Sequence, residues 1–163
     1  MSPALERLLL HPLVLLALAL WALNDHVLKA AWHSSFTGKL SDVAALVAGP
    51  VILAALSALL GVGQRRPAAS VAIWSAVLAF VMIAINLSPL AADLYCRGLG
   101  ALQWPFRCLL AWELRPLVAV DLTIDPSDAW TAPAALIPAL LASRQRVPEG
   151  TDRDPRQAVS RSR

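Results

Sequence analysis

Charged residues are scarce in this chain. Only 15% of its 163 residues are Asp, Glu, Lys or Arg, whereas a typical soluble domain has about 25%. Hydrophobic residues make up 58% of the chain, and they gather in long runs instead of following one stripe of an amphipathic helix. Runs of this kind indicate that the protein folds in lipid. The composition therefore predicts an integral membrane protein, with the lipid bilayer as its first partner.

Two further patterns are absent from the sequence, and each absence limits the partners or metals that are expected. The basic residues are scattered or lie in the C-terminal tail, and no basic stripe alternates with aromatic residues. Nucleic acid is therefore not an expected partner. The sequence also has no His-Glu-x-x-His pattern, which would place two histidine ligands on one face of a helix. It indicates no particular metal or cofactor.

Four apolar segments predict four transmembrane helices, because a helix of about 20 residues spans about 30 Å of hydrocarbon. These segments are residues 8–28, 43–60, 70–87 and 126–142. We expect Pro50 to kink the second one. A cleaved signal peptide is the alternative for the first, since Ala17-Leu18-Ala19 resembles a processing site. The bulky residues Leu20 and Trp21 that follow this site disfavour that alternative.

The segment between the third and fourth apolar runs is the least typical of a membrane span. Ser88-Pro89 is a common helix start and predicts a short interfacial helix from Pro89 to Arg97, ended by Gly98 and Gly100. The β-branched residues at 118–124 allow a small strand or hairpin. The expected fold class is all-α integral membrane, with a four-helix domain at residues 1–143 and a disordered charged tail at residues 144–163.

Basic residues orient this topology. With the amino end inside, nine fall on the inner side and five on the outer side, so both termini are expected to be cytoplasmic, in a bacterial inner membrane. The outer five are Lys29, Lys39, Arg97, Arg107 and Arg115. Cys96 and Cys108 also fall outside, where an oxidising compartment favours a disulfide between them. Two unpaired thiols are the alternative.

The acidic residues gather on the same outer side in two groups. One surrounds Asp25-His26-x-x-Lys29 and continues to His33, Lys39 and Asp42, and the other is Asp125-Pro126-Ser127-Asp128. Helix capping explains part of both groups. Asp125 before Pro126 is an ordinary helix start, Ser41-Asp42 can cap the second span, and Asp25 with Lys29 is an i,i+4 ion pair.

Capping does not explain why several spans would present ionisable groups at one depth. Such groups are costly in a membrane and mark functional sites by default. Asn86, near the outer end of the third span, is expected to be an interhelical hydrogen-bond partner. The expected network or ligand site consists of Asp25, Lys29, Lys39, Asp42, Asn86, Asp125 and Asp128.

Three functional interpretations remain open. In the first, the polar cluster holds the bundle together or binds a small ligand. In the second, the protein is an intramembrane enzyme acting on a lipid or lipid-linked substrate. Its metal or acid/base groups would then be drawn from Asp42, Asp125, Asp128 or His26, with Lys39 binding an anionic head group. In the third, it is a small transporter or channel component, which would need a homo-oligomer or another membrane protein.

Asn-Asp-His-Val-Leu-Lys at residues 24–29 and Thr-Gly-Lys-Leu-Ser-Asp at residues 37–42 resemble motifs of a family of uncharacterised bacterial multi-pass membrane proteins. Asn-Leu-Ser-Pro at 86–89 and Asp-Pro-Ser-Asp at 125–128 resemble later motifs of that family. The sequence departs from the pattern after Asp42 and after Asp128. The resemblance implies that the polar residues belong together as a set, and it implies no activity.

Overall fold

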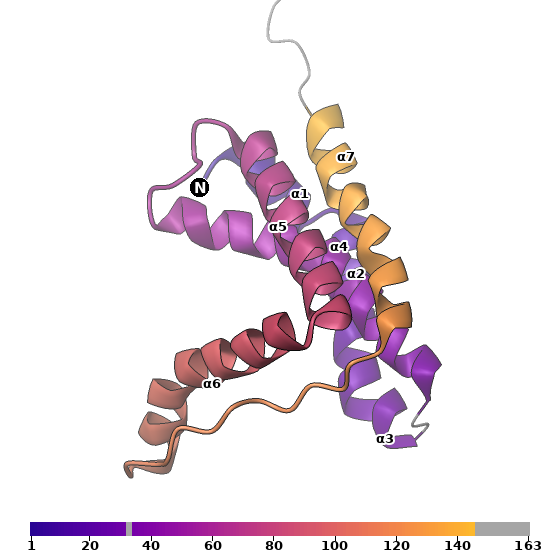
Figure 1. Ribbon diagram of the computed structural model, residues 1–163. Coiled ribbons are helices and arrows are strands. Elements are labelled where there is room, and N and C mark those ends of the chain that lie inside the picture. The colour runs from indigo at the N-terminus through magenta and orange to yellow at the C-terminus, as the bar shows by residue number, and fades with distance from the viewer. Residues whose placement is uncertain (32–33, 146–163) are drawn as a thin grey trace, which may run out of the picture.

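The computed structural model of the protein describes residues 1–31 and 34–145, and these residues form helices and no strand (Figure 1). The α-helices are α1 (Pro3–Leu9), α2 (Pro12–Leu23), α3 (Lys29–Ala31), α4 (Ser35–Leu59), α5 (Pro67–Leu87), α6 (Pro89–Ala111) and α7 (Leu136–Arg144). Two other elements are the π-helix η1 (Asn24–Leu28) and the 3-10 helix η2 (Pro126–Ala135). The expected disordered tail lies outside the described residues from residue 146 onward.

Among the described residues, three helices are long and apolar enough to cross a membrane. They are Pro12–Ala31, Phe36–Leu59 and Pro67–Leu87, and they correspond to the first three predicted spans. The first is a continuous path through α2, η1 and α3. The second begins earlier than predicted, because Ser34 and Thr37 form a capping box that starts α4 at Ser35.

The fourth predicted span is not a single α-helix. Residues 126–144 form η2 followed by α7, and these two elements pack against α5 and α4 (Figure 1). Pro133 lies inside η2 and Pro138 inside α7. Because proline has no N–H to donate to the preceding turn, this spacing disfavours one uninterrupted α-helix.

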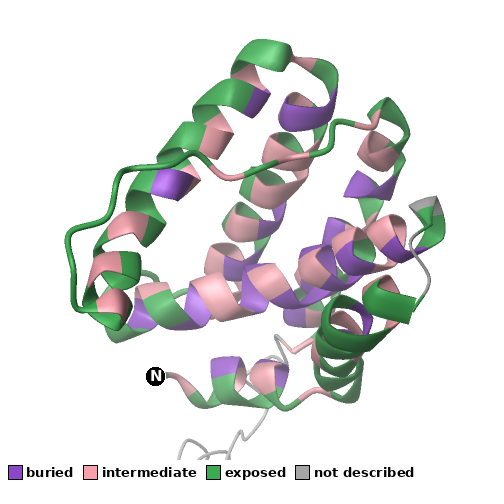
Figure 2. Ribbon diagram, turned by 90° about the horizontal axis from the view of Figure 1, so that it is seen from below, coloured by how far each residue is buried: buried purple, intermediate pink, exposed green. Residues whose placement is uncertain are grey.

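Helix α4 lies at the centre of the bundle. Half of its membrane-length window is buried, whereas the corresponding windows of the first and third candidate spans are 17% and 22% buried. Its inward face is made of small residues such as Ala44, Ala48 and Ala54, which allow neighbouring helices to approach closely. Pro50 is also fully buried in this helix. Figure 2 shows buried positions on the sides that face neighbouring helices, with exposed positions on the outer sides.

Helix α6 corrects the prediction of a short helix ending near Arg97. Ser88 caps its start as predicted, accepting from the backbone N–H of Ala91, but the helix continues for 23 residues. Gly98 and Gly100 do not end it, because neither adopts a positive φ. Gly100 instead allows a close approach: a Cβ there would collide with the carbonyl oxygen of Val118 and lie 3.0 Å from the Cα of Ala119.

Residues 112–125, here called the return segment, run back along α6 toward the bundle (Figure 1). The chain reverses at Trp112, whose backbone adopts the left-handed conformation with φ 53°. The strand or hairpin considered for residues 118–124 does not form. Its neighbour is a helix whose backbone N–H groups are paired within the helix. Beyond the turn at Trp112 and Glu113, the described backbone hydrogen bond between the two is therefore that of the Val120 N–H with the Cys96 carbonyl, at 3.1 Å.

The predicted disulfide is wrong for this fold. Cys96 and Cys108 are both free thiols, and both belong to α6. Twelve residues of α-helix separate their Cα atoms by about 18 Å, whereas a disulfide needs Cα atoms closer than about 7 Å. The bond would require α6 to unwind.

Candidate functional site

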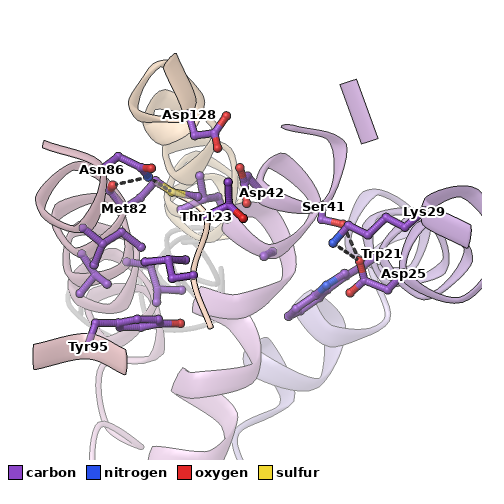
Figure 3. Close-up of a pocket in the computed structure, with 16 residues that line it drawn as sticks. Trp21, Asp25, Lys29, Ser41, Asp42, Met82, Asn86, Tyr95, Thr123 and Asp128 are labelled. Atoms are coloured by element: carbon purple, nitrogen blue, oxygen red, sulfur yellow. Dashed lines mark hydrogen bonds and ion pairs between the residues drawn. The ribbon is translucent and has the colours of Figure 1, made fainter. Parts of the chain in front are cut away.

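The predicted polar residues meet at one end of the bundle, where η1, α4, α5 and the start of η2 come together (Figure 3). Their contacts fall into two groups on either side of Asp42. The first group joins η1 to α4, and the second joins α4 to η2. Their placement at one end of the bundle follows from the fold, since the contact between Lys39 and Asp128 alone joins residues 89 positions apart in the sequence.

The first group is a chain of hydrogen bonds that starts at Asn24. The fully buried Asn24 side chain donates through Nδ2 to the Thr37 carbonyl and to the Ser41 hydroxyl, both at 2.6 Å. Ser41 donates in turn to Asp25 Oδ1 at 2.7 Å, and Lys29 Nζ lies 2.7 Å from the same oxygen. Each donor therefore has a defined acceptor, which fixes η1 against α4.

Asn24 is the first residue of the π-helix η1. Single π turns are rare and occur frequently at functional sites. Here Asn24 is buried while its neighbours Asp25 and His26 are exposed. Its Oδ1 is buried with no hydrogen-bond partner among the described residues, so the burial of this side chain is stabilised only through its amide donors.

The second group is centred on Lys39. Its Nζ lies 2.7 Å from Asp128 Oδ1, 3.5 Å from Asp125 Oδ2 and 2.7 Å from the Ser127 hydroxyl. Asp125 is the N-cap of η2, as predicted, and accepts from the backbone N–H and the hydroxyl of Ser127 at 2.9 and 2.7 Å. These bonds from Ser127, assisted by the charge of Lys39, lower the pKa of Asp125.

Asn86 connects α5 to this second group. Its Oδ1 accepts from the backbone N–H of Asp125 at 3.3 Å. Its Nδ2 donates to the carbonyl oxygen of Met82 at 3.0 Å. Asn86 was expected to be an interhelical hydrogen-bond partner, and in the structure its partner outside α5 is the backbone of the residue that caps η2.

A cavity of about 340 Å³ lies between the two groups. Its apolar wall comes from α4 and α5 and includes Leu46, Leu78, Val81 and Ile85. Its polar side is formed by Asp25, Lys29, Ser41, Asp42, Asn86, Tyr95, Thr123 and Asp128. The cavity therefore places an apolar surface opposite a set of hydrogen-bonding and charged groups.

Asp42 differs from the other carboxylates of the site. It lies inside α4 and borders the cavity near Thr123 and Asp128 (Figure 3). Within the described part of the chain it makes neither a hydrogen bond nor an ion pair, although it is half-buried. The prediction that Ser41 and Asp42 cap the second span is wrong, because α4 starts six residues before Ser41.

One other expected participant does not join the site. His26 is exposed and does not line the cavity, since its place in η1 turns it away from α4. His33, which sequence reasoning grouped with it, lies outside the described residues. No group of three or more His, Cys, Asp or Glu side chains is arranged to hold a metal ion in residues 1–31 and 34–145.

Sequence reasoning missed three contributors to the site. In the sequence Asn24 stands out only as part of the motif at residues 24–29, whereas in the structure it anchors the first group. The signal for it was a polar residue within an apolar span. Tyr95 lines the cavity from the start of α6, and Thr123 reaches it only because the return segment runs back toward the bundle. Burial raises the pKa of the Tyr95 phenol, with a smaller contribution from Cys96, so Tyr95 remains a neutral hydroxyl at physiological pH.

Comparison of the chain with known protein families, with curated proteins and with solved structures finds no match.

Proposed function

We propose that this protein is a multi-pass membrane protein whose cavity at one end of the bundle binds a small amphiphilic ligand. The observation that supports this most is the half-buried Asp42 carboxylate, which borders a cavity and has no partner among the described residues, while neighbouring lysines are already paired. Ligand sites typically combine an apolar lining with a few placed polar groups, and this cavity has that composition.

The charges of the site favour a ligand with a cationic or hydrogen-bond-donating head group. Lys29 is paired with Asp25, and Lys39 is paired with Asp128 and Asp125. Neither ammonium group is available to an anionic head group without breaking an existing ion pair. Asp42, in contrast, has unused acceptor capacity beside the apolar wall. This favours ligand binding over the enzyme interpretation in which Lys39 holds an anionic lipid head group.

The ion pairs have a separate, structural role in this proposal. The Asn24 chain fixes η1 on α4, and the Lys39 group fixes the start of η2 on α4. The two groups thus fix the positions of the elements that border the cavity. Binding and bundle stability are therefore carried by different residues of one cluster.

We further propose that η2 and α7 form a fourth membrane crossing. Ten residues of 3-10 helix rising about 2.0 Å each and nine of α-helix rising about 1.5 Å each reach about 34 Å, enough for a hydrocarbon layer of about 30 Å. Both termini then lie on one side, and the excess of basic residues favours the cytoplasmic side of a bacterial inner membrane. The site lies at the outer ends of the spans.

The binding proposal is tested with octylammonium as the probe and octyl sulfate as the probe of opposite charge. The full chain in lipid nanodiscs is heated with each compound, and the unfolding temperature is recorded. A ligand that binds only the folded state raises that temperature, so octylammonium is expected to stabilise the protein more than octyl sulfate does.

The variant Asp42→Asn is expected to lose this stabilisation. Asp93→Asn is the matched control, because Asp93 is an exposed carboxylate of α6 outside the cavity. If Asp42→Asn, folded and with an unchanged unfolding temperature in the absence of probe, still responds to octylammonium as the unmodified protein does, the assignment of this cavity is wrong.

The topology proposal is tested separately with reporters that are active on only one side of the membrane, fused in turn to the N-terminus and the C-terminus. Both fusions are expected to report the cytoplasmic side. Reports from opposite sides would show that η2 and α7 do not complete a crossing.

A further inference from the structure

Helix α6 has an apolar side that no other segment in residues 1–31 and 34–145 covers. Leu90, Leu94, Leu102 and Phe106 recur at multiples of four residues, and each is between 62% and 68% exposed. Together with Leu109 they fall within an arc of roughly 160° when successive residues are placed 100° apart. An exposed apolar stripe of this length is unusual on a surface that faces water and marks an interaction site.

The charged residues of α6 occupy a different side. Asp93, Arg97 and Arg107 fall within a separate arc of roughly 80° by the same helical spacing, and Arg97 is paired with Asp93 at 2.9 Å. Polar and apolar residues are therefore segregated around this helix, as they are in helices that lie at a membrane surface.

The return segment covers the polar side and leaves the apolar side open. It meets α6 at Gly100, and the Trp104 indole donates to the Arg115 carbonyl at 2.7 Å. Arg115 also pairs with Glu113 at 2.8 Å. The charged residues of α6 therefore lie on the side next to the return segment, and the leucine stripe lies on the other side of the helix.

The place of α6 in the chain identifies what faces the apolar side. The third candidate span ends at Leu87, and α6 begins two residues later at Pro89, so the helix starts at the membrane boundary. Crossing the bilayer again is disfavoured, because residues 89–115 contain five charged side chains, and each costs about 2.5–3.5 kcal/mol at the centre of a span on an insertion scale. The helix also points away from the bundle (Figure 1).

We propose that α6 and the return segment form an amphipathic hairpin that lies in the interface of the same membrane that the bundle crosses. The stripe from Leu90 to Leu109 contacts acyl chains, and the charged side faces water and lipid head groups. Trp112, 90% exposed at the far end of α6, lies where indole rings are enriched in membrane proteins. This surface is independent of ligand binding in the cavity.

The test is a cysteine scan of residues 101–110 in the full chain with Cys96→Ser and Cys108→Ser, reconstituted in phosphatidylcholine vesicles. Each cysteine carries a spin label, and its accessibility to oxygen and to a water-soluble nickel chelate is measured. The ratio of oxygen to nickel accessibility is expected to oscillate with a period of about 3.6 residues. Its maxima fall at positions 102, 106 and 109, and its minima at the matched control positions 103 and 107.

Three results would overturn the proposal. Nickel access at 102 and 106 equal to that at 103 and 107 would place the whole helix in water. A high oxygen ratio on all sides would show that α6 crosses the bilayer. Spin–spin broadening at 102 and 106, with neither reagent reaching them, would show that a second copy of the chain covers the stripe.

Discussion

Replacing Asn24 by alanine is expected to destabilise the bundle more than any other single polar change outside the cavity lining. The substitution removes two hydrogen bonds of 2.6 Å from a side chain that is fully buried. It also ends the chain of donors that runs from Asn24 through Ser41 to Asp25. The attachment of η1 to α4 then depends on the Ser41–Asp25 hydrogen bond and on apolar contacts.

The expected magnitude follows from two contributions. Hydrogen bonds contribute about 1 kcal/mol each in soluble proteins and about 0.6 kcal/mol on average between transmembrane helices, so two bonds contribute about 1–2 kcal/mol. The volume vacated by the amide group adds about 1 kcal/mol, because buried positions relax only in part after truncation. The free energy of unfolding should therefore fall by about 2–3 kcal/mol.

The assay is equilibrium unfolding in mixed micelles with increasing denaturing detergent, followed by helix signal. Asn24→Asp separates the two contributions, because it keeps the volume but replaces the amide donors with acceptors. It should be at least as destabilising as Asn24→Ala. Ser75→Ala is the matched control: the buried Ser75 hydroxyl has no partner among the described residues, so its removal should be neutral or slightly stabilising.

Two results would refute this reasoning. If Asn24→Asp unfolds like the unmodified protein, the amide donors contribute nothing to the attachment of η1. If Asn24→Ala and Ser75→Ala have equal effects, burial of a polar group decides the outcome and its hydrogen bonds do not.

Three further predictions concern α6 and the start of η2. Both cysteines of α6 should react with an alkylating reagent in cells without prior reduction. If the mass shift from alkylation appears only after reduction, the two cysteines form a disulfide and α6 is not continuous. Gly100→Ala should displace the return segment and increase cleavage by a glutamyl endopeptidase after Glu113, whereas Gly98→Ala, with open space around it, should leave the cleavage rate unchanged. The bonds from Ser127 lower the pKa of Asp125. Its stabilising contribution is therefore complete above its ordinary pKa of about 4 and is lost as pH falls through the lowered pKa. Plots of unfolding free energy against pH for the protein and for Asp125→Asn should converge only in acid.

The start and type of several elements could be predicted from the sequence because their signals are local. Asp125 before Pro126 caps η2, and Ser88 before Pro89 caps α6, since a cap needs only residues within one turn. The end of α6 could not be predicted in this way. Gly98 and Gly100 are typical of helix ends, yet here Gly100 serves a close approach by Val118 from a different segment.

The same distinction between local signals and contacts of distant segments applies to the candidate site. The sequence by itself determined that the chain has long apolar helices and that carboxylates, lysines and Asn86 stand near their ends, because hydropathy and helix-start signals are properties of consecutive residues. Only the tertiary structure decided that Lys39 pairs with Asp128, 89 residues away, that Asn24 is buried, and that Asp42 borders a cavity without a partner. Such contacts depend on how the helices pack, and packing is set by the joint fit of side chains from distant segments, which no local pattern encodes.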